Sequence, residues 1–505
     1  MTMKRQKQMM MAALLLLCGV CASAQTADTV YVQTADQPDA GYFLPAPPDI
    51  HDADFIDDMV QWQWGKTMRD TERGWQATRE SLWTPDIMRT VMAEVLQIDT
   101  ISDEATPALS RLLVRAYHTG EQSTVSVKDK YGRIRPFMMM DEDTWGRYDD
   151  DFLRTNGSFV SGHAAFGWAT ALVFAEMWPE LQDTILRRGF QFGENRIITG
   201  AHWQTDVNGG YLCGAAAIAR AHTNPQLQKD IAAARAEYAA LKKLPADYDP
   251  AATADVPHGE CILNNPVDTA SRRYASDLAK YWLGMPLRHT ERGAQAAEEA
   301  EYSTAMMQKV FGEAMGITMS ETETPAICAL IDAVLTKSSE TADRLKAIRF
   351  RKRPFVELGD PSFVPGDEEK ERGKSSFPSG HTNLGWTEAL VLAEVAPDCQ
   401  DEILHRGYQY GYNRLIVGYH WATDIEATRL LSSALVARLH ADAAFCQLMA
   451  AAKAEYERLS TGIQPEVQVP RPSSGKQQVY RMDGIYAAAG THGIVIQNGQ
   501  KMVVK

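Results

Sequence analysis

Residues 161–177 read SGHAAFGWATALVFAEM, and residues 379–395 read SGHTNLGWTEALVLAEV. In each stretch a Ser-Gly-His triplet leads into a run of apolar residues that is typical of a buried helix. Serine is a good N-cap residue, and glycine lets the backbone approach a ligand closely. The two stretches lie 218 residues apart, and residues far from either stretch share this offset. The chain therefore contains an internal duplication, and each copy includes one such predicted helix.

The duplication covers most of the chain. Its register starts at Thr106 and Thr324 and is still intact at Tyr238 and Tyr456. An earlier segment, 71–74, returns as 290–293 at an offset of 219. The recurring reactive side chains are Lys128, Arg135, His163, Arg196, His202 and Asp206, which return as Lys346, Arg353, His381, Arg414, His420 and Asp424. Cations, imidazoles and one carboxylate indicate a centre that handles an oxyanion, present twice.

Both repeats are predicted to be mostly helical, because apolar residues recur at spacings of three and four. We expect an all-α protein of two tandem helical bundles with a short β-hairpin-like tail. A fused homodimer would pack its two repeats as an intramolecular pseudo-dimer. The expected divisions are a signal peptide at 1–24, repeat 1 at 42–244, a linker at 245–267, repeat 2 at 268–460, a second linker at 461–478 and a tail at 479–505.

The N-terminus has the pattern of a secretory signal. Lys4, Arg5 and Lys7 precede an apolar stretch that ends in the small residues 22–24. A membrane anchor is the alternative, but the apolar stretch is short and ends in a cleavage site. The sequence therefore predicts a periplasmic protein.

The C-terminal tail also bears on the localisation of the protein. Apolar runs flank residues 498–499, an Asn-Gly pair that predicts a β-hairpin. The tail also resembles the short C-terminal sorting sequences of secreted Bacteroidetes proteins. Cell-surface or secreted localisation is the alternative that this resemblance implies, and a plain structural extension is the other reading.

Composition excludes some classes of function. The formal net charge is −14, and it falls to −17 without the leader's three cations. An acidic body argues against nucleic-acid binding. Beyond the leader, no uncharged apolar run approaches the roughly 18 residues of a spanning helix, so stable membrane insertion is not expected. The five cysteines outside the leader are unmatched between repeats and do not form a disulfide framework.

Two cations precede the Ser-Gly-His triplet in each repeat. Lys128 and Arg135 are seven residues apart, which places them on one face if the segment is helical, and Pro136 ends or bends that helix. Two such cations are usually solvated surface. Their recurrence as Lys346 and Arg353 favours a function instead.

The triplet itself suits an anion. A helix that begins after Ser161 or Ser379 offers unpaired N–H groups and a positive dipole end, with Gly162 or Gly380 at its first turn. The alternative is a capped helix with a structural histidine.

A third motif places a carboxylate four residues after a histidine. His202 and Asp206 follow Arg196, and a His–Asp pair at this spacing on a helix can meet. The carboxylate would then fix the tautomer of the imidazole and stabilise its cation. A helical ion pair is the alternative. A metal site is disfavoured, because two histidines beside three cations would repel a divalent ion.

In this order, Lys-x6-Arg-Pro, Ser-Gly-His and Arg-x5-His-x3-Asp resemble the type-2 phosphatidic acid phosphatase superfamily. Within it, the chain is similar to the bacterial class A non-specific acid phosphatases. Residues 377–382, 385–386 and 200–206 carry that likeness, together with the Thr-Glu-Arg-Gly segments at 71–74 and 290–293 and the residues at 44–48. The resemblance covers nearly all of both repeats.

The resemblance implies a role for each recurring residue. His202 and His420 would be nucleophiles that form a phosphohistidine, oriented by Asp206 and Asp424, and His163 and His381 would protonate the leaving group. The groups that would hold the phosphate oxygens are Lys128, Arg135, Arg196, Ser161 and Gly162 in repeat 1, and Lys346, Arg353, Arg414, Ser379 and Gly380 in repeat 2. Small phosphomonoesters are the implied substrates, with no metal or other cofactor and with vanadate binding as a phosphate mimic.

The chain departs from the family pattern at two places. Val160 stands where the family has proline, and Asn195 and Asn413 stand where it has serine. Asparagine can donate a hydrogen bond to an oxyanion, so we expect altered tuning. The rival functions are a vanadium-dependent haloperoxidase, a lipid-phosphate or pyrophosphate phosphatase, and a secreted scaffold with retired sites.

Overall fold

The computed structural model describes residues 29–146, 150–251 and 255–461, and in the tail residues 479–481, 493–497 and 500–504. The predicted signal peptide, 1–24, lies outside the described residues. The chain forms two compact units: one extends to Glu457 and contains both repeats, and the other is Arg458–Lys505. The regular elements described in the first unit are all helices, as predicted.

The helices of repeat 1 follow the chain in this order: η1 (Thr34–Asp36), α2 (Ala40–Phe43), α3 (Ala53–Met68), α4 (Glu72–Arg79), α5 (Pro85–Leu96), α6 (Pro107–Gln122), α7 (Val125–Tyr131), α8 (Pro136–Met139), α9 (Asp150–Arg154), α10 (Gly162–Met177), η2 (Pro179–Leu181), α11 (Gln182–Ile198), α12 (Gln204–Ala221) and α13 (Pro225–Lys242).

Repeat 2 has a matching series: α14 (Gly259–Ile262), α15 (Tyr274–Gly284), η3 (Pro286–His289), α16 (Glu291–Glu298), α17 (Thr304–Met315), α18 (Pro325–Ile348), α19 (Pro354–Glu357), η4 (Pro365–Asp367), α20 (Glu368–Glu371), α21 (Gly380–Val395), η5 (Pro397–Cys399), α22 (Gln400–Ile416), α23 (Ala422–His440) and α24 (Ala443–Ser460). In this series α18 corresponds to α6 and α7 together.

The helices α10 and α21, which follow the two Ser-Gly-His triplets, are the centres of the two repeats. Every residue of α10 is buried, which explains why its sequence is apolar on all sides. It contacts α6, α11 and α12, and α21 contacts α18, α22 and α23 in the same way. One continuous apolar core includes residues of both repeats.

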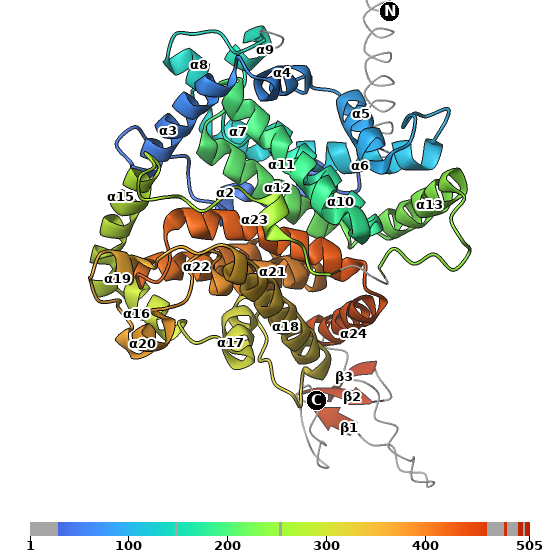
Figure 1. Ribbon diagram of the computed structural model, residues 1–505. Helices are drawn as coiled ribbons and strands as arrows, with labels where there is room; N and C mark the ends of the chain where they lie inside the picture. The colour runs from blue at the N-terminus through green and yellow to red at the C-terminus, as the bar shows by residue number, and fades with distance from the viewer. Residues whose placement is uncertain are drawn as a thin grey trace, which may run out of the picture. The chain divides into compact units, whose positions relative to one another are not determined.

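The two repeats pack on each other around a pseudo-twofold axis. Helix α23 lies against α10 and α12 (Figure 1). The rings of His222 and His440, which are equivalent residues, stack with centroids 3.8 Å apart and planes at 10°. Asn208 Nδ2 donates to Glu426 Oε2 at 3.2 Å, and these two residues are also equivalent. A residue that contacts its own counterpart is the mark of a twofold interface, so the predicted pseudo-dimer is present.

Each repeat also extends a short arm, residues 36–44 in repeat 1 and 255–263 in repeat 2, onto the other repeat. Helix α2 of repeat 1 contacts α22 of repeat 2, and α14 of repeat 2 contacts α11 of repeat 1. The backbone N–H of Asp39 donates to Asp401 Oδ1 at 2.8 Å, and the N–H of His258 donates to Asp183 Oδ1 at 2.9 Å. These two bonds join equivalent residues, so each arm is fastened to the other repeat in the same way.

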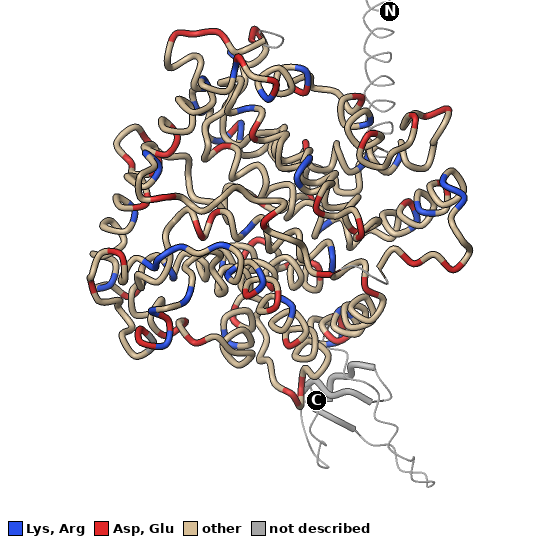
Figure 2. Tube along the Cα trace, viewed as in Figure 1, with Lys and Arg blue, Asp and Glu red and all other residues tan. Residues whose placement is uncertain are grey.

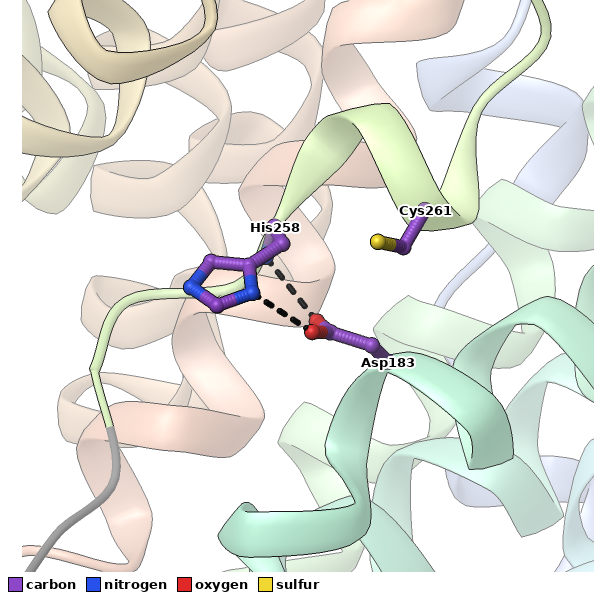
Figure 3. Close-up of side chains that lie close together, drawn as sticks. All are labelled: Asp183, His258 and Cys261. Carbon is purple, nitrogen blue, oxygen red and sulfur yellow. Dashed lines mark hydrogen bonds and ion pairs between the residues drawn. The ribbon is translucent and has the colours of Figure 1, made fainter.

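Figure 3 shows the second fastening point, where His258 and Cys261 lie beside Asp183 of α11. His258 Nδ1 lies 2.8 Å from Asp183 Oδ2. Tyr42 stands at the position equivalent to Cys261, and it bonds Glu402 of α22. Residues 255–263, which we predicted to be part of the linker 245–267, therefore form a structured arm. The sequence hid this arm because it is too short for helical periodicity.

Figure 2 shows lysine and arginine residues interspersed with aspartate and glutamate along the described trace. No helix in the described ranges is both long and apolar enough to cross a membrane. The tail forms a three-stranded antiparallel sheet of β1 (Val479–Arg481), β2 (Gly493–Gln497) and β3 (Gln500–Val504). Strands β2 and β3 pair on either side of residues 498–499, so the predicted hairpin is confirmed by the described strands.

Glu388 is a buried carboxylate in the middle of α21, and neither of its oxygens has a hydrogen-bond partner in the described part of the chain. Burial raises its pKa well above 4.5, so the carboxylate costs stability once pH exceeds the pKa of the unfolded chain. We expect Glu388→Met to raise the free energy of unfolding by about 2 kcal/mol at pH 7, measured in urea. The gain should shrink below about pH 4.5, where glutamate is neutral in both states.

Glu394 on the same helix supplies the matched control. It is equally buried, but it pairs with His440 at 2.9 Å and with Lys453 at 2.6 Å. Glu394→Met should therefore destabilise the protein. A loss of stability in Glu388→Met would contradict the interpretation of that residue.

Candidate active site

The recurring residues of repeat 2 meet around one cavity. Lys346 lies in the last turn of α18, Arg353 caps α19, and Arg414 lies in the last turn of α22. The cavity has a volume of about 430 Å³, and its walls include Lys346, Arg353, Gly380, His381, Arg414 and His420. Six of the predicted groups, which lie in or next to five helices, therefore line one pocket.

The equivalent residues of repeat 1 also lie together. Arg135 Nη1 and His202 Nε2 are 2.9 Å apart. Burial lowers the pKa of Lys128 well below 10.5, and repulsion from Arg135 and Arg196 adds to the effect. Burial and then Arg196 lower the pKa of His163. Lys128 and Arg135 both donate to the carbonyl oxygen of Gly157, and Arg196 and His163 both donate to that of Ser81. The three cations and both imidazoles of repeat 1 therefore form one buried cluster.

The cations of repeat 2 are also crowded. Burial, followed by Arg353, lowers the pKa of Lys346 to about 8. Burial lowers the pKa of Arg414 to about 10. Its Nε and Nη1 groups are buried and have no acceptor among the described residues. An oxyanion bound here would accept these hydrogen bonds and relieve the repulsion.

The nucleophile predicted in repeat 2 is held in a defined tautomer. His420 Nδ1 lies 2.6 Å from the carbonyl oxygen of Ser376, which can only accept, so Nδ1 carries the proton. Nε2 then presents a lone pair, which accepts from Arg353 Nη1 at 3.1 Å. Burial and Arg353 lower the pKa of His420 well below 6.5, which keeps Nε2 unprotonated.

The role predicted for the two aspartates needs a correction in repeat 2. His202 Nδ1 lies 3.5 Å from Asp206 Oδ2, as expected. Asp424 accepts from the hydroxyl of Ser376 at 2.6 Å, as Asp206 accepts from that of Ser158, but His420 Nδ1 bonds the backbone carbonyl oxygen of Ser376. Asp424 therefore positions His420 through Ser376.

This difference also appears in the pKa values. Although burial opposes it, Arg133 and then His202 hold the pKa of Asp206 below 3.8. Burial raises the pKa of Asp424, and Arg351 offsets only part of that rise. The contact with His202 adds to the lowering in repeat 1, and repulsion from Asp277 adds to the rise in repeat 2.

The third motif works differently from the helical pair that we expected. His202 precedes α12, and Asp206 is the third residue of that helix. Asp206 Oδ2 accepts from the backbone N–H of Trp203 at 2.9 Å, and Asp424 does the same with Trp421 at 3.1 Å. The four-residue spacing therefore serves a helix cap that turns the histidine toward the carboxylate.

The first motif is not on one helix either. Helix α7 ends at Tyr131 and is capped by Gly132, whose φ of 52° is left-handed, and α18 ends at Ile348. Arg135 and Arg353 are extended residues before a proline, with ψ of 154° and 152°. The expectation of one helical face was wrong, because a residue before proline avoids the helical region. A bend between the two cations brings them to one pocket instead.

The Ser-Gly-His triplets begin their helices as predicted. Ser161 Oγ accepts from the N–H of Ala164 at 3.4 Å, and Ser379 Oγ accepts from the N–H of Thr382 at 3.3 Å. Gly162 and Gly380 are the first residues of α10 and α21.

The two histidines predicted to protonate the leaving group are fixed by the backbone. His163 Nε2 donates to the carbonyl oxygen of Ser81 at 3.0 Å, and His381 Nε2 donates to that of Ala300 at 2.9 Å. Because a carbonyl oxygen only accepts, Nε2 carries a proton in both rings. Nδ1 is then the nitrogen that can transfer a proton to a substrate.

The two asparagines bond buried carboxylates. Asn195 Nδ2 donates to Glu80 Oε2 at 2.9 Å, and Asn413 Nδ2 donates to Glu299 Oε2 at 2.6 Å. Each of these bonds uses one of the two N–H groups of the amide.

A buried layer behind each predicted nucleophile was missed. In repeat 2, Arg351 donates to Asp424 at 2.6 Å and to Asp277 at 2.6 Å. In repeat 1, Arg133 joins Asp206 and Asp58 at 2.6 and 2.7 Å. The arginines recur at the offset of 218 and the outer aspartates at 219, so the duplication contained the signal.

Away from the two predicted anion sites, two groups of described side chains have donor atoms close enough to hold a metal ion. They are Asp183, His258 and Cys261, and His222, Glu394 and His440. The first is the arm contact of Figure 3, whose N–H-to-carboxylate bond recurs in the other arm with Asp39 and Asp401. In the second the imidazole planes are stacked, and one ion cannot lie in two parallel ring planes. Neither group contains a residue of the two anion sites.

Comparison with known proteins supports the same interpretation. The model of the PAP2 superfamily matches residues 109–229 and 326–445. A non-specific acid phosphatase of Providencia stuartii is 37% identical over 217 residues, which are 43% of this chain and 87% of that protein. One from Salmonella typhimurium is 33% identical over 221 residues, 43% of this chain and 88% of that protein. An acid phosphatase of Zymomonas mobilis is 35% identical over 199 residues, 39% of this chain and 75% of that protein. The chain belongs to the PAP2 superfamily and is a relative of the non-specific acid phosphatases. The family domain occurs twice in this chain.

Proposed function

We propose that the chain hydrolyses small phosphomonoesters through a phosphohistidine, with one complete site in each repeat and without a metal ion. The observation that carries this proposal is the pocket of repeat 2. There the Nε2 lone pair of His420 and the unpaired N–H groups of Arg414 lie on one cavity. Phosphoryl transfer needs positioning and charge neutralisation, and three cations can supply the neutralisation.

The reaction proceeds in two displacements. Nε2 of His420 attacks phosphorus, the bond from phosphorus to the ester oxygen breaks, and the leaving alkoxide takes a proton from Nδ1 of His381. Water then attacks the phosphohistidine and returns a proton to Nδ1 of His381, and the P–N bond breaks to release phosphate. Lys346, Arg353 and Arg414 hold the phosphate oxygens throughout. The same steps apply to His202 and His163.

Two assays test metal independence and the main rival function, a vanadium-dependent haloperoxidase. We expect the purified chain to release phosphate from a chromogenic phosphomonoester at an unchanged rate in EDTA, because fixed cations neutralise the phosphate. The same protein should not oxidise bromide when it is given vanadate and peroxide. Loss of hydrolysis in EDTA that added metal restores would refute metal independence, and halide oxidation would favour a haloperoxidase.

The rate should depend on pH as a bell with its optimum below neutrality. His420 must be neutral, and its lowered pKa keeps it neutral until the solution is well below pH 6.5, where the rate falls. His381 must be protonated. In the free protein burial and Arg414 lower its pKa, and a bound phosphate dianion opposes that shift. The rate should therefore fall again as pH rises and His381 loses its proton.

A variant separates the two limbs of this profile. His381→Asn should slow the hydrolysis of esters with poor leaving groups and remove the alkaline limb of kcat. The acid limb, which belongs to His420, should persist. An alkaline optimum, or an alkaline limb that survives in the variant, would contradict the assignment.

We also propose that the protein is exported to the periplasm, with secretion or display at the cell surface as the alternative. The charged and apolar pattern of residues 4–24 supports export. Cell fractionation and N-terminal sequencing of the mature protein test it, and a mature chain that retains residues 1–24 would contradict it.

A further inference from the structure

Equivalent aromatic side chains stand beside the acid histidine of each repeat. The Trp83 ring meets the His163 ring edge to face, with centroids 5.0 Å apart. Tyr302 meets His381 in the same way at 5.1 Å. Each aromatic residue directly precedes the N-cap of the next helix, Thr84 or Ser303. The surroundings of these two rings nevertheless differ.

Trp83 lies directly on the first residue of α10. A β-carbon added to Gly162 would come within 2.2 Å of the Cη2 atom of Trp83 and 2.9 Å of its Cζ3 atom. The indole Nε1 donates to the carboxylate of Glu121 in α6, which holds the ring in this place. His163 is 1% exposed. The indole therefore covers the face of the site on which the acid histidine lies.

Tyr302 leaves the equivalent face open. Its hydroxyl is 2.9 Å from the hydroxyl of Ser339, the counterpart of Glu121. Outside its chain neighbours and its own helix backbone, the only atom of the described residues within 4 Å of a β-carbon added to Gly380 is Lys346 Nζ, at 3.5 Å. Gly380 and His381 are partly exposed, and Tyr302 and Ser339 line the 430 Å³ cavity.

The open face is where the alcohol part of a substrate must lie, because the acid histidine protonates the ester oxygen. We infer that the cavity of repeat 2 is a leaving-group site for polar alcohols of nucleoside size, and that Trp83 restricts repeat 1 to small leaving groups. A cavity of this volume lies in the usual range for small-molecule sites. Its outer wall is polar, with Glu301, Asp343, Lys370 and Lys374. This inference rests on the proposed function.

Enzymes with a single working site test the inference. His202→Ala leaves repeat 2 active, and His420→Ala leaves repeat 1 active. Phosphate release is measured from adenosine 5′-monophosphate and from methyl phosphate. We expect the ratio of kcat/KM for the large ester to that for the small ester to be at least about tenfold higher in His202→Ala than in His420→Ala.

Removing the indole should open repeat 1. In the His420→Ala background, Trp83→Ala should raise kcat/KM for adenosine 5′-monophosphate by about tenfold or more and change that for methyl phosphate by less than about threefold. Trp83→Tyr, which copies repeat 2 and keeps an aromatic ring, should give part of the gain if the alanine variant folds poorly. Trp75→Ala is the matched control, because Trp75 is 52% exposed and contacts Trp145 instead of the site.

The outcomes separate this inference from the function on which it rests. If neither ester is hydrolysed by the unmodified chain, the proposed function fails and the inference falls with it. If the unmodified chain works but neither Trp83 variant changes the ratio of the two esters, the inference alone is overturned.

Discussion

A chain that carries both His202→Ala and His420→Ala is expected to hydrolyse a chromogenic phosphomonoester at least about 10³-fold more slowly than the unmodified chain. Each substitution removes the nitrogen that would bond to phosphorus, and the cations that remain can bind phosphate without transferring it. The rate of product release under saturating substrate is the measurement. Circular dichroism should show the helical content unchanged.

The cation pockets should persist in the double variant. Phosphate should therefore still protect it against thermal unfolding, which separates loss of chemistry from loss of binding. His289→Ala combined with His51→Ala is the control, since these histidines lie outside both anion sites. A double variant with full activity would refute histidine nucleophiles in both repeats.

Arg351→Met is expected to lower the free energy of unfolding by about 3–5 kcal/mol. The guanidinium joins two carboxylates that are 0% exposed, Asp277 and Asp424, and without it both would stay buried and lose the cation that bonds them. Urea unfolding at pH 7 measures the loss. The kcat of the folded fraction should fall as well, because Asp424 positions His420 through Ser376.

Neighbouring variants distinguish the buried pairing from a general loss of positive charge. Lys352→Met removes an exposed cation that lies 3.4 Å from Glu357, and it should change stability by less than about 1 kcal/mol. Adding Asp277→Asn to Arg351→Met should recover part of the stability, since one buried charge is then neutral. Equal losses in Arg351→Met and Lys352→Met would contradict the role of the buried layer.

The duplication made the anion site predictable from the sequence. A single Ser-Gly-His triplet is compatible with an ordinary capped helix, but its recurrence with Lys346, Arg353 and Arg414 in one register is not. The all-α class followed from apolar residues at spacings of three and four in both repeats, and the pseudo-dimer followed from the fusion of two copies. These features depend on local patterns and on the constant offset, both of which are visible in one sequence.

The remaining features depend on contacts that a local pattern does not contain. Arg353 reaches the pocket through a bend before proline, and Asp424 acts through a serine 48 residues earlier. The arms at 36–44 and 255–263 are fixed by carboxylates of the opposite repeat, which no spacing along the chain reveals. The place of Trp83 over Gly162 likewise depends on how α10 packs against the segment between α4 and α5.

A crystal structure of the chain with orthovanadate tests the central claim most directly. We expect vanadium bonded to Nε2 of His420, with its oxygens held by Lys346, Arg353 and Arg414, and the equivalent arrangement at His202. Vanadate bound away from both histidines, or Nε2 of His420 still bonded to Arg353 with vanadate at saturation, would contradict it.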